Sequence, residues 1–258
     1  ATATDLTVDQ NISNPNGTTY FNTVTAAVAA SVSGDRIFIE SGTYNENSLN
    51  IINKSLTFIG NAPNRGVNLS ILFILKGNSL QHIDFINLDM LTIRLSGYPN
   101  QSSPQKNTVN IIDCTVNTII DDLGSFQQPL ANSGAICNVY QSNIVYYDCA
   151  FGEIVNSSIT TLSVKPKDSS WTNLPADPIL ILGNTIENLN IRASIPFIIA
   201  NNIIANNNPA PSSFIISQWD TNLENENLIA NNSFGPGMFL SITHNPPSYN
   251  LTFTNNSA

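Results

Sequence analysis

Three basic residues stand where β-strands could turn them outward: Arg94, Lys165 and Arg192. Each follows an apolar residue, and Arg94 lies between Ile93 and Leu95, so on a strand it would face away from the core. A polysaccharide lyase needs such a base, together with a positive charge or a calcium ion that neutralises the uronate carboxylate. These cations are therefore the catalytic candidates if the chain is a lyase.

Other catalytic patterns are weaker. Asp121 and Asp122 are adjacent, so on a strand they would face opposite sides, and in a loop they would need further oxygen ligands to bind calcium. They are weak metal candidates. The two histidines, His82 and His244, lie in unrelated segments and suggest no Ser-His-Asp arrangement. We expect no cofactor, with calcium considered only for a lyase.

One long interruption of the strand pattern could bind a ligand. Residues 165–175 contain Lys165, Lys167, Asp168 and Trp171. An aromatic ring can stack on a sugar face while nearby polar groups bond its hydroxyls, and binding residues concentrate on loops. These four residues are the binding candidates, and the alternative is that Trp171 folds back over a coil edge.

The composition excludes several classes of protein. Of 258 residues only 10% are charged, against about 25% in ordinary soluble domains. The net charge of −9 argues against nucleic acid, whose binding needs clustered Lys and Arg. No apolar run approaches the roughly 20 residues of a membrane helix, so we expect no membrane span.

The cysteines and the first residues bear on the compartment. Cys114, Cys137 and Cys149 allow at most one disulfide and lack the paired spacing of a zinc site, so buried free thiols are the simplest interpretation. The sequence opens Ala-Thr-Ala-Thr, which suits a mature secreted protein and equally a trimmed chain. Secretion or a cell-surface location is the expectation.

The pattern along the chain indicates a solenoid. Residues 20–32 show helical spacing, and short segments of period two follow, with apolar pairs such as Ile37 and Ile39 or Leu91 and Ile93. Small polar residues recur after many strands at unequal intervals, which is typical of stacked coils with loops of different length. Stacked asparagines could bond in a ladder, which would account for the 39 asparagines. The recurring positions are Asn87, Cys114, Cys149, Asn184, Asn202, Asn232 and Asn256.

Residues 20–61 carry a recognisable opening. The runs Ser33-Gly34-Asp35-Arg36-Ile37-Phe38-Ile39-Glu40-Ser41-Gly42-Thr43-Tyr44-Asn45-Glu46 and Lys54-Ser55-Leu56-Thr57-Phe58-Ile59-Gly60 follow the helical segment. This opening resembles that of pectin-lyase-like right-handed parallel β-helix proteins. The resemblance implies an all-β solenoid with an N-terminal capping helix, and it leaves function open because the fold carries esterases, lyases, glycosidases and adhesins. The sequence lacks the characteristic motifs of pectin methylesterases, pectate lyases and polygalacturonases.

We therefore predict an N-terminal strand or loop with a capping helix at 1–33 and a right-handed parallel β-helix at 34–258. The preferred function is binding, as an adhesin-like, glycan-binding or surface-assembly domain, and the alternative is a polysaccharide lyase or hydrolase acting on an acidic polysaccharide. The last coil shows no capping helix, so the expected partners are a glycan or another protein subunit, the latter through this C-terminal coil.

Overall fold

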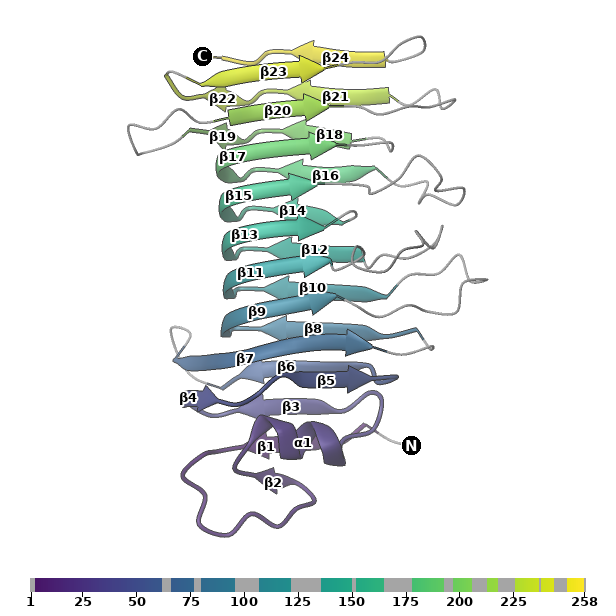
Figure 1. Ribbon diagram of the computed structural model, residues 1–258, viewed down its shortest axis with the longest axis vertical. Coiled ribbons are helices and arrows are strands. Elements are labelled where there is room, and N and C mark those ends of the chain that lie inside the picture. Colours follow the sequence, from purple (N-terminus) through teal and green to yellow (C-terminus); the bar gives the residue numbers. More distant parts are fainter. Residues whose placement is uncertain are drawn as a thin grey trace.

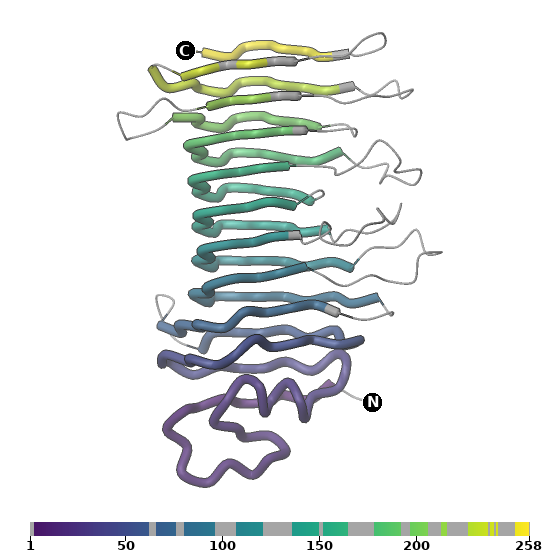
Figure 2. The backbone as a smooth tube through the Cα atoms, viewed as in Figure 1, coloured from purple at the N-terminus to yellow at the C-terminus, as the bar shows by residue number. Residues whose placement is uncertain are grey.

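The computed structural model describes the chain except residues 1–2, 62–65, 77–79, 96–106, 122–135, 150–151, 165–177, 193–196, 206–212, 218–225, 237, 244–249 and 258. The chain is a right-handed parallel β-helix, with its coils stacked from the helix-capped end to the last strand (Figure 1). Consecutive strands of each sheet come from successive coils, and all strand pairs are parallel. Figure 2 shows the same stack as a continuous tube. The predicted fold class is confirmed.

Two long sheets form the walls of the solenoid. In order, the first sheet contains β2 (Tyr20–Phe21), β1 (Asp5–Val8), β3 (Arg36–Ile39), β6 (Leu56–Gly60), β8 (His82–Ile86), β10 (Thr108–Ile112), β12 (Ile136–Tyr140), β14 (Glu153–Val155), β16 (Ile179–Leu182), β18 (Phe197–Ala200), β21 (Glu226–Ala230) and β24 (Asn250–Thr254). The second contains β22 (Ser233–Phe234), β19 (Ile203–Ile204), β17 (Thr185–Arg192), β15 (Ser158–Val164), β13 (Asn143–Cys149), β11 (Thr115–Asp121), β9 (Asp89–Leu95), β7 (Val67–Lys76) and β4 (Gly42–Asn45). Beside this path, β5 (Leu49–Ile52) pairs with β7, and β20 (Ser213–Ser217) pairs with β17 and β23 (Phe239–Thr243).

The core consists of inward columns of apolar side chains that repeat from coil to coil. Phe58 and Phe85 stack with ring centroids 5.2 Å apart, and Phe73 from the other sheet meets both rings edge-on. All three cysteines are buried and free, as predicted. Each coil thus buries its apolar face only through its neighbours, which is the physical basis of a solenoid.

A ladder of inward side chains runs along the turn between the two sheets. Oδ1 of Asn202 accepts hydrogen bonds from the backbone N–H of Asn184 at 2.8 Å and from its amide Nδ2 at 3.0 Å. Asn232 makes the same two bonds to Asn202, at 3.0 and 2.9 Å, so buried backbone donors find partners one coil away. The members, in order, are Cys114, Ser142, Ser157, Asn184, Asn202, Asn232 and Asn256.

The ladder departs from prediction at two positions. The residue before each ladder member has a positive φ, from 51° at Gln141 to 67° at Gly183. The first departure is Asn87, which has a φ of 56° and so is one of these preceding residues rather than a ladder member. Cys149 lies at the end of β13 instead. The sequence pattern identified a turn but did not distinguish the left-handed residue, where Asn is tolerated, from the inward residue after it.

The predicted cap is a short helix, α1 (Val24–Ala30), rather than the whole of residues 20–32. Thr23 is the N-cap of the helix, and its side chain accepts a hydrogen bond from the N–H of Ala26. Tyr20 and Phe21 form β2 instead of a helical turn. The recognised opening explains this geometry. Glu46 accepts the N–H groups of the first turn, and Lys54 donates to carbonyls of the last turn.

The far end is formed by β24, which pairs with β21 and with no other strand that the structure describes. Phe253 of β24 stacks on Phe234 with centroids 6.1 Å apart and is 46% exposed. No helix among the described residues is long and apolar enough to cross a membrane.

Candidate functional site

The second sheet presents a surface rich in hydroxyl and amide groups. We name the outward side chains of β11, β13, β15 and β17 the hydroxyl–amide face. Strand register aligns them in columns without shifts, so that Thr118, Tyr146, Thr161 and Asn188 occupy one column. Ile120, Asp148, Ser163 and Asn190 occupy the next column. Equivalent residues in neighbouring strands lie about 4.8 Å apart.

The chemistry of this face is unusually uniform. Each strand contributes four outward positions, and the buried residues between them include Ile119, Tyr147, Leu162 and Leu189. Twelve of these sixteen positions are uncharged and polar, and none is a cation. The outward residues are Thr115, Asn117, Thr118, Ile120, Asn143, Val145, Tyr146, Asp148, Ser158, Thr160, Thr161, Ser163, Thr185, Glu187, Asn188 and Asn190.

Two adjacent members of the face have unsatisfied polar atoms. Oγ of Ser163 and Oδ1 of Asn190 have almost no surface open to solvent, and they lack a hydrogen-bond partner among the residues that the structure describes. Ser163 is only 3% exposed, although it points away from the core between the inward Leu162 and Val164. A buried polar atom without a partner costs free energy, so each such atom in a folded protein needs an explanation.

Tyr146 belongs to the neighbouring column of the same face. Its hydroxyl donates to Oδ2 of Asp148 at 3.2 Å. Burial, together with the charge and the hydrogen bond of Asp148, raises the pKa of Tyr146 above its ordinary value. The hydroxyl therefore stays protonated at neutral pH, and the ring is held at a fixed place on the face.

The structure places the predicted cations only in part. Arg94 points outward from β9, as expected, and is aligned with Ile120 in the Ser163 column. Arg192 is the last residue of β17, two positions beyond Asn190, and its side chain lies outside the described part. Four strand spacings, or roughly 19 Å, separate the two along the axis, so their backbones do not converge on one reacting atom. Lys165, which immediately follows β15, lies outside the described residues.

The remaining candidates cannot be placed either. Lys167, Asp168, Trp171, Asp122 and His244 fall outside the described residues. Asp121 ends β11, aligned with Leu95, and its side chain is outside the description too. Their roles in binding or metal ligation stay predictions.

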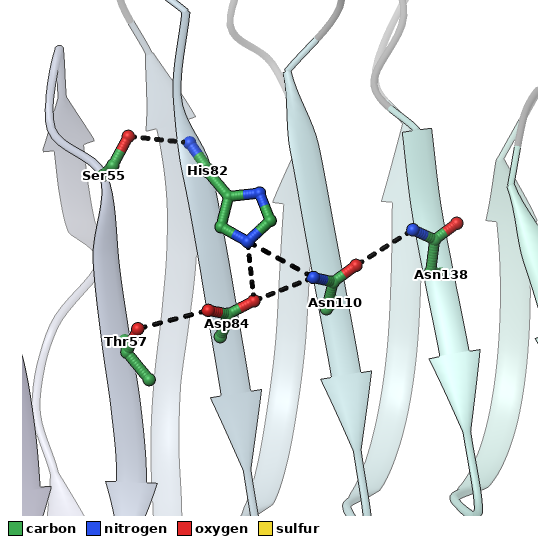
Figure 3. A network of polar contacts seen from close by, with 6 residues as sticks. All are labelled: Ser55, Thr57, His82, Asp84, Asn110 and Asn138. Atoms are coloured by element: carbon green, nitrogen blue, oxygen red, sulfur yellow. Dashed lines mark hydrogen bonds and ion pairs between the residues drawn. The ribbon is translucent and has the colours of Figure 1, made fainter. Parts of the chain in front are cut away.

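A second polar cluster lies on the outer face of the first sheet (Figure 3). Asp84 accepts hydrogen bonds from Thr57 Oγ1 at 3.2 Å and Asn110 Nδ2 at 2.8 Å, and its Oδ1 lies 3.0 Å from Nε2 of His82. Asn138 donates in turn to Asn110 at 2.9 Å. This network joins four coils of the first sheet, and its amide donors point towards the carboxylate.

The contacts of this network indicate that it stabilises the coils rather than forms a catalytic centre. His82 bonds to a carboxylate, which is the ordinary state of a lone surface histidine, and the nearby hydroxyl of Ser55 already accepts the His82 backbone N–H at 2.9 Å. The described residues contain no group of three or more His, Cys, Asp or Glu side chains placed to hold a metal ion. The hydroxyl–amide face is the better candidate for function because its outward hydroxyl and amide groups lie in columns aligned over four strands.

Sequence reasoning missed this face. It searched for charged and aromatic groups, whereas the signal was polar residues alternating with buried ones, as in Ser158-Ile159-Thr160-Thr161-Leu162-Ser163-Val164. The doubled Thr160-Thr161 breaks the period of two, because both residues lie outside the core between the buried Ile159 and Leu162. In the same way Leu91, predicted to alternate inward with Ile93, is 50% exposed at the equivalent position of β9.

The parallel strand register and the stacked coils define a right-handed parallel β-helix. No family model matches the chain, and no curated protein matches its sequence. The similar solved structures include the pectin methylesterase from Aspergillus niger in deglycosylated form, 14% identical with a TM-score of 0.45, and the same enzyme in penultimately deglycosylated form, 13% identical with a TM-score of 0.42. Each match covers 96% of this chain and 92% of the other. At these TM-scores the likeness adds nothing to what the strand register shows.

Proposed function

We propose that this chain is a secreted or cell-surface domain that works by binding glycans, with the hydroxyl–amide face as its platform. The carrying observation is that twelve of the sixteen outward positions of this face are uncharged and polar and lie in aligned columns. Sugars offer hydroxyls that donate and accept, so they match such a surface. Tyr146 supplies an aromatic ring against which a sugar can pack.

The predicted binding loop follows a strand of this platform in the sequence. Residues 165–175 begin directly after Val164, the last residue of β15, and Ser163 is the residue before it. We propose that Lys167 and Trp171 take part in binding the same ligand. This is a prediction about the loop, which the described residues do not include.

A glycan-binding screen tests the proposal. The purified domain is incubated with immobilised polysaccharides, and each bound polymer is then checked for new double bonds and new reducing ends, with and without calcium. Retention without turnover supports a binding domain. Turnover that is lost on changing Arg94 to Ala would establish the lyase alternative instead, and the absence of retention on every polymer would refute glycan binding.

Trp171→Ala examines the loop separately. We expect weaker retention with an unchanged melting temperature, because a side chain that contacts ligand contributes little to folding. A melting temperature lowered by many degrees would show that Trp171 packs against the coil edge.

A further inference from the structure

A stripe of apolar side chains runs along the outer face of the first sheet. Seven consecutive strands, from β3 to β16, each contribute one partly exposed residue to the same outward column. We name these residues the apolar stripe, and they are Phe38, Ile59, Ile86, Ile112, Tyr140, Val155 and Leu182. We propose that the stripe joins two copies of this chain, side by side about a two-fold axis parallel to the solenoid axis. The proposed glycan platform lies on the other sheet, so this inference is independent of it.

Two further strands extend the apolar surface. Ala200 of β18 and Ala230 of β21 continue the column. The outward residues beside its far part are apolar as well, namely Leu180, Ile198 and Leu228. Nine strands about 4.8 Å apart, each with about 13 Å of its length in contact, cover roughly 500 Å² on each copy. A pair would therefore bury about 1,000 Å² in total, which is the lower limit for a specific interface and indicates a weak dimer.

The repeat of the stripe favours a second copy over a helical partner. Neighbouring members lie about 4.8 Å apart along the axis. Successive turns of an α-helix lie about 5.4 Å apart, so a helix laid along the seven strands would be about 4 Å out of register at its end. A second stripe has the same repeat and stays in register over the whole length. The two copies then use the same surface, as a two-fold axis requires.

The polar residues on either side of the stripe select the direction of the second copy. On one side are outward residues two positions before a stripe member, in order Asp84, Asn110, Asn138 and Glu153. On the other side are the left-handed turn residues that follow the same members, in order Asn87, Asp113, Gln141 and Asn156. A two-fold axis along the stripe brings each residue of the first group opposite the partner's residue at the same place in the second. Every carboxylate of the two groups then faces an amide.

The opposite direction brings like charges together. An antiparallel pair that overlaps the whole stripe is centred on Ile112, its middle member, so Asp113 lies against its own copy. Two carboxylates placed in this way repel each other. Arg36, the cation in the column beside the stripe, is already paired with Asp5 at 2.8 Å, so it is not available to neutralise them. The charges therefore favour the parallel pair.

Sedimentation of the purified chain from about 1 to about 200 µM measures the association. We expect a monomer–dimer equilibrium that salt strengthens, because salt screens the net charge of −9 on each copy. Ile112→Lys places two ammonium groups against each other in the middle of the interface. It should weaken the dimer by about tenfold or more. The melting temperature should stay the same, because the side chain points away from the core.

Leu91→Lys is the matched control for this variant. Leu91 is 50% exposed and belongs to β9 of the second sheet, outside the stripe. If any exposed apolar residue promoted association, this change would weaken the dimer too. We expect it to leave the association unchanged.

Single cysteines near the two ends of the stripe test the direction. In the parallel pair every stripe member faces its own copy, and packed sheets lie about 10 Å apart. Ile59→Cys and Leu182→Cys should therefore both form covalent dimers with a short bismaleimide. In an antiparallel pair these positions lie far from their own copies. The parent chain is the control, because its three cysteines are buried.

Three results would overturn the inference. The first is a parent chain that stays monomeric at about 200 µM. The second is a dimer that Ile112→Lys leaves intact; if Phe253→Lys then dissociated it, the contact would lie at β24 in the last coil instead. The third is a dimer in which neither cysteine variant is cross-linked. The glycan screen can be repeated with Ile112→Lys, so none of these results decides the proposed function.

Discussion

Replacing one asparagine of the ladder should show how much these buried amides stabilise the solenoid. Asn202 is 1% exposed, and its side chain makes four hydrogen bonds. Asn202→Ala removes them all. The backbone N–H of Asn184 then has no partner, whereas Nδ2 of Asn184 still reaches the Ile154 carbonyl and Oδ1 of Asn232 still accepts the N–H of residue 202.

The magnitude follows from these contacts. An orphaned buried donor costs about 1–3 kcal/mol, and the lost bond to the Ile181 carbonyl about 1 kcal/mol. The small cavity left by the amide adds about 1 kcal/mol. We therefore expect Asn202→Ala to lower the free energy of unfolding by about 3–5 kcal/mol.

Two further variants make the test specific. Asn202→Ser should recover about half of the loss, because Ser157 holds the same ladder position and its Oγ accepts the Ser142 N–H at 3.1 Å. Asn201→Gly is the matched control, since Asn201 is exposed and its φ of 59° suits glycine. Its expected effect is below about 1 kcal/mol.

Denaturant unfolding, followed by the circular dichroism of the strands, measures all three variants. The slope with denaturant should be compared as well, because a solenoid can unfold in parts. If Asn202→Ala shifted the midpoint no more than Asn201→Gly does, the ladder bonds would contribute no net stability and the reasoning would be refuted.

Three other perturbations test the cap, the tyrosines and a close backbone contact. Glu46→Ala should cost about 1–2 kcal/mol in thermal unfolding, because Glu46 accepts the N–H groups of the first turn of α1; an unchanged melting temperature would contradict its capping role. Burial, with the hydrogen bond and charge of Glu153, raises the pKa of Tyr140 from 10.0 to about 12. Because the unfolded state deprotonates first, the contribution of Tyr140 to stability is complete below pH 10 and is lost between pH 10 and 12. Tyrosinate absorbance during alkaline unfolding measures this, and Tyr140→Phe should reduce the loss. Gly152→Ala should lower the free energy of unfolding by more than about 2 kcal/mol, because a Cβ there would overlap a carbonyl oxygen of β12. Gly17→Ala, which has open space around it, should lower it by about 1 kcal/mol. Equal losses in denaturant unfolding would contradict the overlap.

The opening of the chain was the most predictable part, and its contacts explain why. Asp35 accepts the N–H groups of Thr4 and Val32, and Tyr44 donates to the carbonyls of Val8 and Glu40. Each of these residues performs a local, geometrically demanding task that few other residue types could take over. Their spacing is therefore fixed, and a pattern in the sequence is enough to identify the fold.

The hydroxyl–amide face is less predictable because its positions tolerate exchange. In one column Thr118, Tyr146, Thr161 and Asn188 occupy equivalent places, and the sequence distances between them vary with the length of the intervening loops. No fixed sequence spacing therefore predicts that these four residues lie in one column. Only the strand register, set by the buried residues on either side, reveals that they share a surface.

The same register explains why function on this fold can change without disturbing stability. The inward columns and the turn ladder carry the packing and the buried hydrogen bonds, whereas outward positions of the second sheet such as Ser158 and Thr185 are exposed and contribute little to either. Ser163 and Asn190 differ from these positions because their unsatisfied atoms make the face slightly worse for folding alone.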